Sequence, residues 1–183
     1  MEITLDCYGK TSIGRVRSSN EDNFLVADLT KSMRVQGTSA GLDQRTRLFG
    51  SSQGKLLAVA DGLGGHESGD RASELAIDTI ARHVLNELDW ASHKTPEPET
   101  TQSRLTDALQ ACHTRIHEEV ERTPQSAGMG TTVTLAYVSW PNLYVAHVGD
   151  SRCYLLREGQ FRQITRDHTI AQLQEDGEVE ADT

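Results

Sequence analysis

Two short apolar segments of the sequence each end at an aspartate beside a glycine. Residues 56–60 are entirely apolar and lead into Asp61 and Gly62, and the largely apolar residues 143–148 lead through Gly149 to Asp150. Short apolar runs bounded by glycine predict buried strands, so each carboxylate is expected at a strand end. Glycine lacks a Cβ and lets a ligand or an ion approach the backbone closely. We therefore expect these two strand ends to meet at a functional site.

A third acidic element, Glu21 and Asp22, lies just before another strand-like run. An aspartate next to glycine is most often a turn residue, and for any one position that interpretation would prevail. Three such elements together favour a metal site. The sequence has no HExxH motif and no Cys/His cluster, which disfavours zinc, whereas all-oxygen ligation suits Mg²⁺ or Mn²⁺. Asp61 is the candidate ligand shared by two ions, and the Gly62 carbonyl is a further oxygen donor.

Arg17 precedes Asp22 by five residues in a polar segment. Its planar guanidinium matches two oxygens of a phosphate group. A solvated surface arginine, or an ion-pair partner of Glu21, is the simpler interpretation of Arg17 taken alone.

Composition limits the classes of function. The 183 residues fit one domain, 1–183, and 36% hydrophobic with 25% charged residues indicate a globular chain. The net charge of −9 argues against a nucleic-acid partner and against binding to an anionic membrane surface. It also means that an acidic cleft would repel a phosphate group unless cations were bound first. Three scattered cysteines, no signal-peptide pattern and no apolar stretch of about 20 residues predict a cytoplasmic protein.

Hydrophobic periodicity predicts an α+β fold. Helices are expected at 67–88 and 102–122, where apolar residues recur at helical spacing, with a proline-containing connector at 90–101. The expected strands are 2–8, 23–28, 55–61, 131–140, 143–149, 152–157 and 161–165, and a short helix is expected at 168–176. Residues 29–54 are expected to form a loop or an excursion between paired strands. This order favours a helix pair that covers one face of a sheet.

Five motifs together resemble the metal-dependent serine/threonine protein phosphatases of type 2C, the PPM fold, in their bacterial branch. They are residues 14–24, 58–66, 128–132, 146–152 and 164–169, in the order that the family has them. The resemblance implies a four-layer αββα sandwich of two antiparallel sheets flanked by helix pairs. It also implies hydrolysis of phosphoserine and phosphothreonine in proteins, opposing a serine/threonine kinase.

The same resemblance implies a role for each candidate residue. Asp61 would bridge two Mn²⁺ or Mg²⁺ ions, Gly62 would give a carbonyl, and Glu21 and Asp22 would act in or next to the metal shell. Arg17 would hold the substrate phosphate, and Asp150 would bind a third, weaker metal. Metal-activated water would attack the phosphorus. Leu63 stands where eukaryotic members carry a histidine proposed as a general acid, so a leaving group would take its proton from elsewhere.

The sequence departs from the family pattern at its C-terminal side. The family domain continues past the position of Thr183 with a flap segment and two further metal-binding aspartates, which are expected to be missing here. Two hypotheses follow. The chain is a metal-dependent phosphatase, or it is a truncated, catalytically impaired domain that binds a phosphoprotein or another partner.

Overall fold

The computed structural model describes residues 5–35, 47–64, 66–88, 97–169 and 172. Strands β1 (Asp22–Arg34) and β2 (Arg47–Leu63) precede helices α1 (His66–Glu87) and α2 (Pro98–Arg122) and the 3₁₀ turn η1 (Pro124–Ser126). Then follow β3 (Gly130–Thr131), β4 (Val133–Ser139), β5 (Asn142–Val148), β6 (Tyr154–Arg157) and β7 (Gln160–Gln163). The α+β class with two antiparallel sheets is confirmed.

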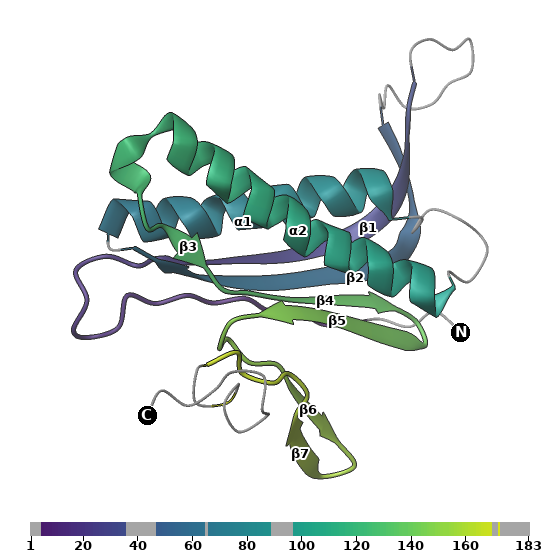
Figure 1. Cartoon of the computed structure of the whole chain (residues 1–183). Helices are drawn as coiled ribbons and strands as arrows, with labels where there is room; N and C mark the ends of the chain where they lie inside the picture. Colours follow the sequence, from purple (N-terminus) through teal and green to yellow (C-terminus); the bar gives the residue numbers. More distant parts are fainter. Residues whose placement is uncertain (1–4, 36–46, 65, 89–96, 170–171, 173–183) are drawn as a thin grey trace.

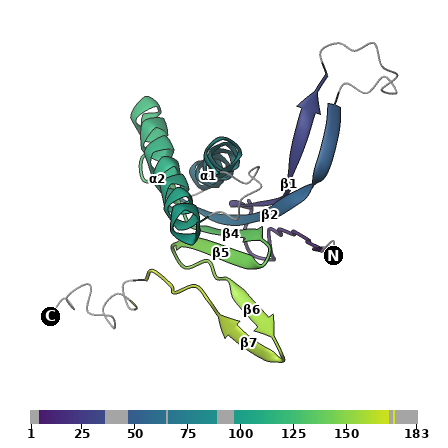
Figure 2. The ribbon, with the colours of Figure 1, turned by 90° about the vertical axis from the view of Figure 1, so that its right-hand side faces the viewer.

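The larger sheet has the strand order β1-β2-β4-β5, and the short β3 pairs with the end of β2. All of its pairings are antiparallel. Helices α1 and α2 lie together across one face of this sheet, as predicted (Figure 1). The hairpin β6–β7 forms the smaller sheet on the opposite side (Figure 2).

Side chains along β2 point alternately to the two faces of the sheet, and those on the helix side form part of the core. Leu56, Ala58 and Ala60 are buried against the helices, whereas Val59 between them is 44% exposed on the other face. The helices contribute apolar residues at helical spacing, and each large one adds about 1.5–3 kcal/mol through burial. The main core cluster includes Ala76, Ile80 and Val84 of α1, Leu105 and Cys112 of α2, and Leu135 and Tyr137 of β4. The core thus anchors the strand that carries Asp61.

Two predicted segments were wrong. Residues 5–8 form no strand, although Leu5 and Cys7 are half-buried and alternate with exposed neighbours; residues 1–4 lie outside the described part. The loop alternative for 29–54 was wrong for most of the described residues, because β1 continues to Arg34 and β2 begins at Arg47, whereas the alternative of an excursion between paired strands agrees with the pairing of β1 and β2. Residues 36–46 lie outside the described part. The outer parts of β1 and β2 form a two-stranded arm whose pairing is irregular near Thr30. A shifted register interrupts the regular alternation of side chains by which a strand is predicted from sequence.

Residues 90–96 of the expected connector at 90–101 lie outside the described part, and the end of that prediction was wrong. Helix α2 begins at Pro98, where a proline fits because the first helical N–H has no partner within the helix. Helix α1 and the strands β6 and β7, which a two-residue turn joins, were predicted to within a few residues. Most of the predicted helix at 168–176 lies outside the described residues.

Candidate metal centre

The pairing of β1 with β2 brings two predicted carboxylates together. Asp22 at the start of β1 lies directly opposite Asp61 near the end of β2. Facing residues in an antiparallel pair have Cβ atoms about 4.5–5.5 Å apart, so both side chains reach the same region of space. Glu21 immediately precedes β1 and is half-buried.

Close backbone packing fixes Glu21 and Gly62. The Gly62 amide donates to the Glu21 carbonyl over 3.1 Å, and the Ser73 hydroxyl of α1 donates to the same carbonyl over 2.6 Å. A Cβ on Gly62 would lie only 2.0 Å from the carbonyl oxygen of Gly69, and one on Gly69 would lie 2.2 Å from a carboxylate oxygen of Glu21. The first turns of α1 therefore pack directly against the acidic strand ends.

Asp61 is held by its backbone, which leaves its carboxylate free for other contacts. Its amide donates to the Thr132 hydroxyl over 3.1 Å, and its carbonyl accepts from the Thr132 amide and the Thr131 hydroxyl, both over 2.9 Å. The Thr132 hydroxyl also lies 2.6 Å from that of Ser151, the residue after Asp150. This polar bridge joins the end of β2 to the segment that carries Asp150.

Three neighbouring carboxylates influence the pKa of Asp61 at this site. The pKa of Asp61 is raised above its ordinary value, first because its carboxyl loses part of its water and then because of the negative charges of Asp22 and Asp150. A hydrogen bond with the Asp22 carboxyl and the charge of Glu21 raise the pKa of Asp61 further. Asp61 as a whole residue is nevertheless exposed, so the site is an open acidic cleft.

These residues fit divalent metal ions by chemistry and charge. Concentrated carboxylate oxygens repel one another, and a hard dication offsets that repulsion. In the part of the chain that the structure describes, however, no three His, Cys, Asp or Glu side chains stand close enough together to enclose an ion. The structure thus provides a converging donor set rather than a closed coordination shell.

Arg17 lies beside the carboxylates. It lines a pocket of about 210 Å³ together with Glu21, Asp22 and Asp61. A second pocket of about 270 Å³, also lined by Asp22 and Asp61, includes Lys10 and Ser151. The structure therefore brings a guanidinium and an open cavity to the same acidic edge, which suits an anionic ligand once cations are present.

The raised pKa of Asp61 makes stability depend on pH. The folded protein holds this proton more readily than the unfolded chain, whose value is 3.8, so the contribution of Asp61 to stability is lost as pH rises through the folded pKa. In the metal-free protein, Asp61→Asn is expected to raise the thermal midpoint at about pH 7.5, and the gain should shrink toward about pH 4. Thermal unfolding in EDTA, followed by circular dichroism, checks this expectation. An unchanged or lower midpoint at the higher pH would contradict it.

Several positioning residues were missed from the sequence. Ser73, Gly69 and Thr132 hold the strand ends, and Asn23 donates to the Ser73 hydroxyl over 2.9 Å. Serine and glycine within a helix give no local signal of such roles, and neither does a threonine between two strands, such as Thr132 between β3 and β4. Only the three-dimensional packing of α1 against β1 and β2 identifies them.

The model of the protein phosphatase 2C family matches residues 9–181 of this chain. The chain therefore belongs to the protein phosphatase 2C family, as its motifs indicate. No helix among the described residues combines the length and apolar character needed to cross a bilayer.

Named relatives agree with this assignment. The chain is 39% identical over 118 residues to the serine/threonine protein phosphatase PstP of Mycobacterium tuberculosis. The matched region covers 64% of this chain and 21% of that protein. It is 30% identical over 171 residues to the serine/threonine phosphatase stp of Listeria monocytogenes, covering 93% of this chain and 58% of that protein. The chain thus spans about half or less of the length of these relatives.

Solved structures share the fold. The catalytic domain of PstP in complex with two manganese ions is 33% identical, with a TM-score of 0.62 over 91% of this chain and 58% of that one. The serine/threonine phosphatase of S. agalactiae is 26% identical, with a TM-score of 0.63 over 93% of this chain and 60% of the other.

Proposed function

We propose that this chain hydrolyses phosphoserine and phosphothreonine in proteins, with Mn²⁺ or Mg²⁺ bound at the acidic strand ends. The observation that supports the proposal most is the strand register that places Asp22 opposite Asp61, with Arg17 and Glu21 lining the same pocket. The charge of Asp150, from a third part of the chain, also contributes to the raised pKa of Asp61. The manganese complex of the related PstP catalytic domain gives independent support for the metal. In this proposal Asp61 is shared by two ions and Asp150 serves a third.

Each residue has a distinct part in the proposed reaction. Asp61, Asp22, Glu21 and the Gly62 carbonyl would hold the cations. When bound, such ions lower the pKa of water and offset charge on phosphoryl oxygens. Arg17 would bind two oxygens of the substrate phosphate through its guanidinium and so orient the phosphorus toward the acidic edge. The exposure of Asp61 leaves the cleft open to a residue on a protein surface.

The biological setting follows from the proposed substrate. A phosphoprotein substrate implies a serine/threonine kinase that supplies it, and a signalling role in the cytoplasm. The acidic surface, with a net charge of −9, gives no support to a nucleic-acid partner.

A second function, a module that binds phosphoproteins without turnover, is favoured by one observation. The described residues do not enclose an ion on their own, so the centre could be too weakly liganded for catalysis. In that case Arg17 would still recognise a phosphate, and the carboxylates would be inactive.

A phosphate-release assay separates the two functions. The purified chain is expected to release phosphate from a phosphothreonine peptide in Mn²⁺ and not in EDTA. Arg17→Ala should raise KM about 10- to 100-fold, since charge-assisted hydrogen bonds contribute about 1.5–3 kcal/mol. Arg15→Ala, two residues earlier in the same exposed segment and outside the pocket, is the matched control and should behave as wild type.

Phosphopeptide binding that depends on Arg17, without phosphate release at any Mn²⁺ concentration, would reject the enzyme in favour of the binding module.

A further inference from the structure

Helix α2 carries two histidines four residues apart, His113 and His117. Residues at this spacing lie one above the other on the same face of a helix. It is also the spacing of the two zinc ligands in an HExxH helix, here without the glutamate between them. Both His113 and His117 are exposed. The pair lies outside the acidic centre described above.

The two imidazole rings are already close together. Their centroids are 4.4 Å apart, with an angle of 66° between the ring planes. A metal ion bound through a ring nitrogen at about 2.0–2.1 Å lies about 3.2 Å from the ring centroid, so two rings on one ion, at an angle of about 90–110°, have centroids about 4.5–5.2 Å apart. The observed separation is therefore close to that of a shared ligand pair, without any change in the helix.

Neither ring is committed to another partner within the described residues. No hydrogen bond joins His113 or His117 to any other group in residues 5–35, 47–64, 66–88, 97–169 or 172. By contrast, His83 on α1 lies 3.1 Å from the carbonyl of Arg104, and both ring nitrogens of His147 are engaged, by Thr134 and by the carbonyl of Arg166. His113 and His117 thus differ from histidines that hold the fold together.

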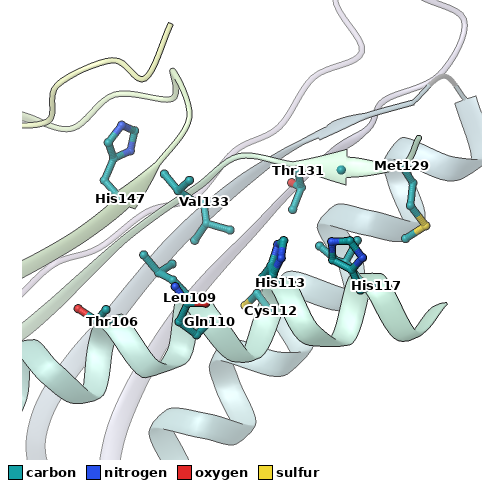
Figure 3. Close-up of a pocket in the computed structure, with 13 residues that line it drawn as sticks. Thr106, Leu109, Gln110, Cys112, His113, His117, Met129, Thr131, Val133 and His147 are labelled. Atoms are coloured by element: carbon teal, nitrogen blue, oxygen red, sulfur yellow. The ribbon is translucent and has the colours of Figure 1, made fainter. Parts of the chain in front are cut away.

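Both rings line a pocket of about 570 Å³ between α2 and strands β3 to β5. Figure 3 shows them on the side of α2 that faces Thr131 and Met129. The other potential soft donor from α2, Cys112, is unsuitable because burial raises its thiol pKa to about 12. None of the residues that line this pocket is an aspartate or a glutamate. The donors therefore differ in kind from the carboxylates around Asp61.

We propose that His113 and His117 form a binding site for a borderline transition-metal dication, such as Ni²⁺, Zn²⁺, Co²⁺ or Cu²⁺. Imidazole nitrogen suits these ions, whereas Mg²⁺ and Mn²⁺ favour oxygen ligands. The described residues supply two protein ligands, and water fills the remaining positions. The positive charges nearby are offset, because Arg115 pairs with Glu119 and Arg122 with Glu118. The site does not depend on the proposed phosphatase activity.

The histidine pocket and the acidic centre have a residue, Thr131, in common. Thr131 lines the histidine pocket, and its hydroxyl donates to the Asp61 carbonyl over 2.9 Å. An ion at the histidine pair would therefore be separated from the acidic centre by β3, whose Thr131 contacts the Asp61 carbonyl. The two centres would select different metals, because one offers imidazole nitrogens and the other carboxylate oxygens.

Calorimetric titration of the untagged chain with Ni²⁺ tests this proposal. Excess Mg²⁺ is kept present so that it competes for the carboxylates. One Ni²⁺ per chain is expected to bind, and His113→Gln or His117→Gln should raise Kd at least about tenfold, since even outer-shell changes cost 10- to 100-fold in affinity. Thermal unfolding gives a second measurement, because Ni²⁺ should raise the midpoint of the wild type more than that of either variant.

His83→Gln is the matched control, since it removes an imidazole from the neighbouring helix while a glutamine amide still donates to the Arg104 carbonyl. It should bind Ni²⁺ as the wild type does. If either histidine variant fails to fold, the other decides, because both residues are exposed. Absence of saturable binding, or an affinity that His113→Gln leaves unchanged or that His83→Gln lowers equally, overturns the proposal.

Discussion

An Asp61→Asn variant is expected to lose almost all metal-dependent hydrolysis of an aryl phosphate. The other three carboxylates of the centre lie close enough to Asp61 to raise its pKa, so Asp61 is the central residue among the candidate metal ligands. An asparagine keeps the shape of the side chain but removes its charge and one of its metal-binding oxygens. Losing a single preorganised electrostatic contact costs about 10²–10³ in rate, and loss of a shared metal ligand should cost at least as much.

The assay compares kcat/KM for p-nitrophenyl phosphate across a Mn²⁺ titration. Asp28→Asn is the matched control, because Asp28 lies on the same strand pair, opposite Lys55, and forms an ion pair with it over 2.8 Å. That variant should retain wild-type activity. Because Asp61→Asn relieves charge repulsion in the metal-free fold, inactivity of the variant would not reflect unfolding. Activity within a few fold of wild type would instead remove Asp61 from the centre.

The helices and the central strands could be predicted from local pattern. Helix α1 has an uninterrupted apolar stripe, and the residues of that stripe, such as Ile80 and Val84, are fully buried. The short apolar run before Asp61 forms the centre of β2 and pairs with both β1 and β4. In these segments hydrophobic period and burial agree, so the sequence alone indicates the element.

Local pattern failed where no buried face shapes the sequence. The outer part of the β1–β2 arm has a shifted register near Thr30, and its polar residues were interpreted as a loop. Residues 5–8 show the reverse case, since alternating burial is present but no strand partner is. Alternation reports which side chains face the protein, whereas a strand also needs a hydrogen-bonding neighbour, which the local sequence does not specify.

For the candidate site, the sequence indicated residue types but not their arrangement. That Asp22 faces Asp61 follows from the register of β1 on β2, which local spacing does not reveal. The spacing of His113 and His117 was visible in the sequence, yet the closeness of their rings and their lack of hydrogen-bond partners among the described residues required the structure. The type of chemistry could therefore be predicted where a motif indicates it. The arrangement of the side chains in space became known only from the structure.

The second large effect is expected for Gly62→Ala, and it concerns stability. A Cβ at this position would lie 2.0 Å from the Gly69 oxygen, 2.4 Å from the Gly69 carbonyl carbon and 2.9 Å from the Glu21 oxygen. All three are backbone atoms, so no side-chain rotation relieves the contact, and α1 would have to move away from the strand ends. Overpacking costs about 1–3 kcal/mol and occasionally more, and we expect about 3 kcal/mol or more here. For a chain of this length, that lowers the thermal midpoint by about 6–12 °C.

Gly130→Ala is the matched control for this prediction. Gly130 pairs with Leu63, the residue after Gly62, but a Cβ there would meet nothing within 4 Å. Its variant should unfold within about 2 °C of wild type, since substitutions away from packed features change stability by about 0.5 kcal/mol. Thermal and urea unfolding of the two variants in EDTA separate packing from metal binding. Equal midpoints for Gly62→Ala and Gly130→Ala would show that α1 does not press against the acidic strand ends, and the arrangement around Glu21 would then lose its physical basis.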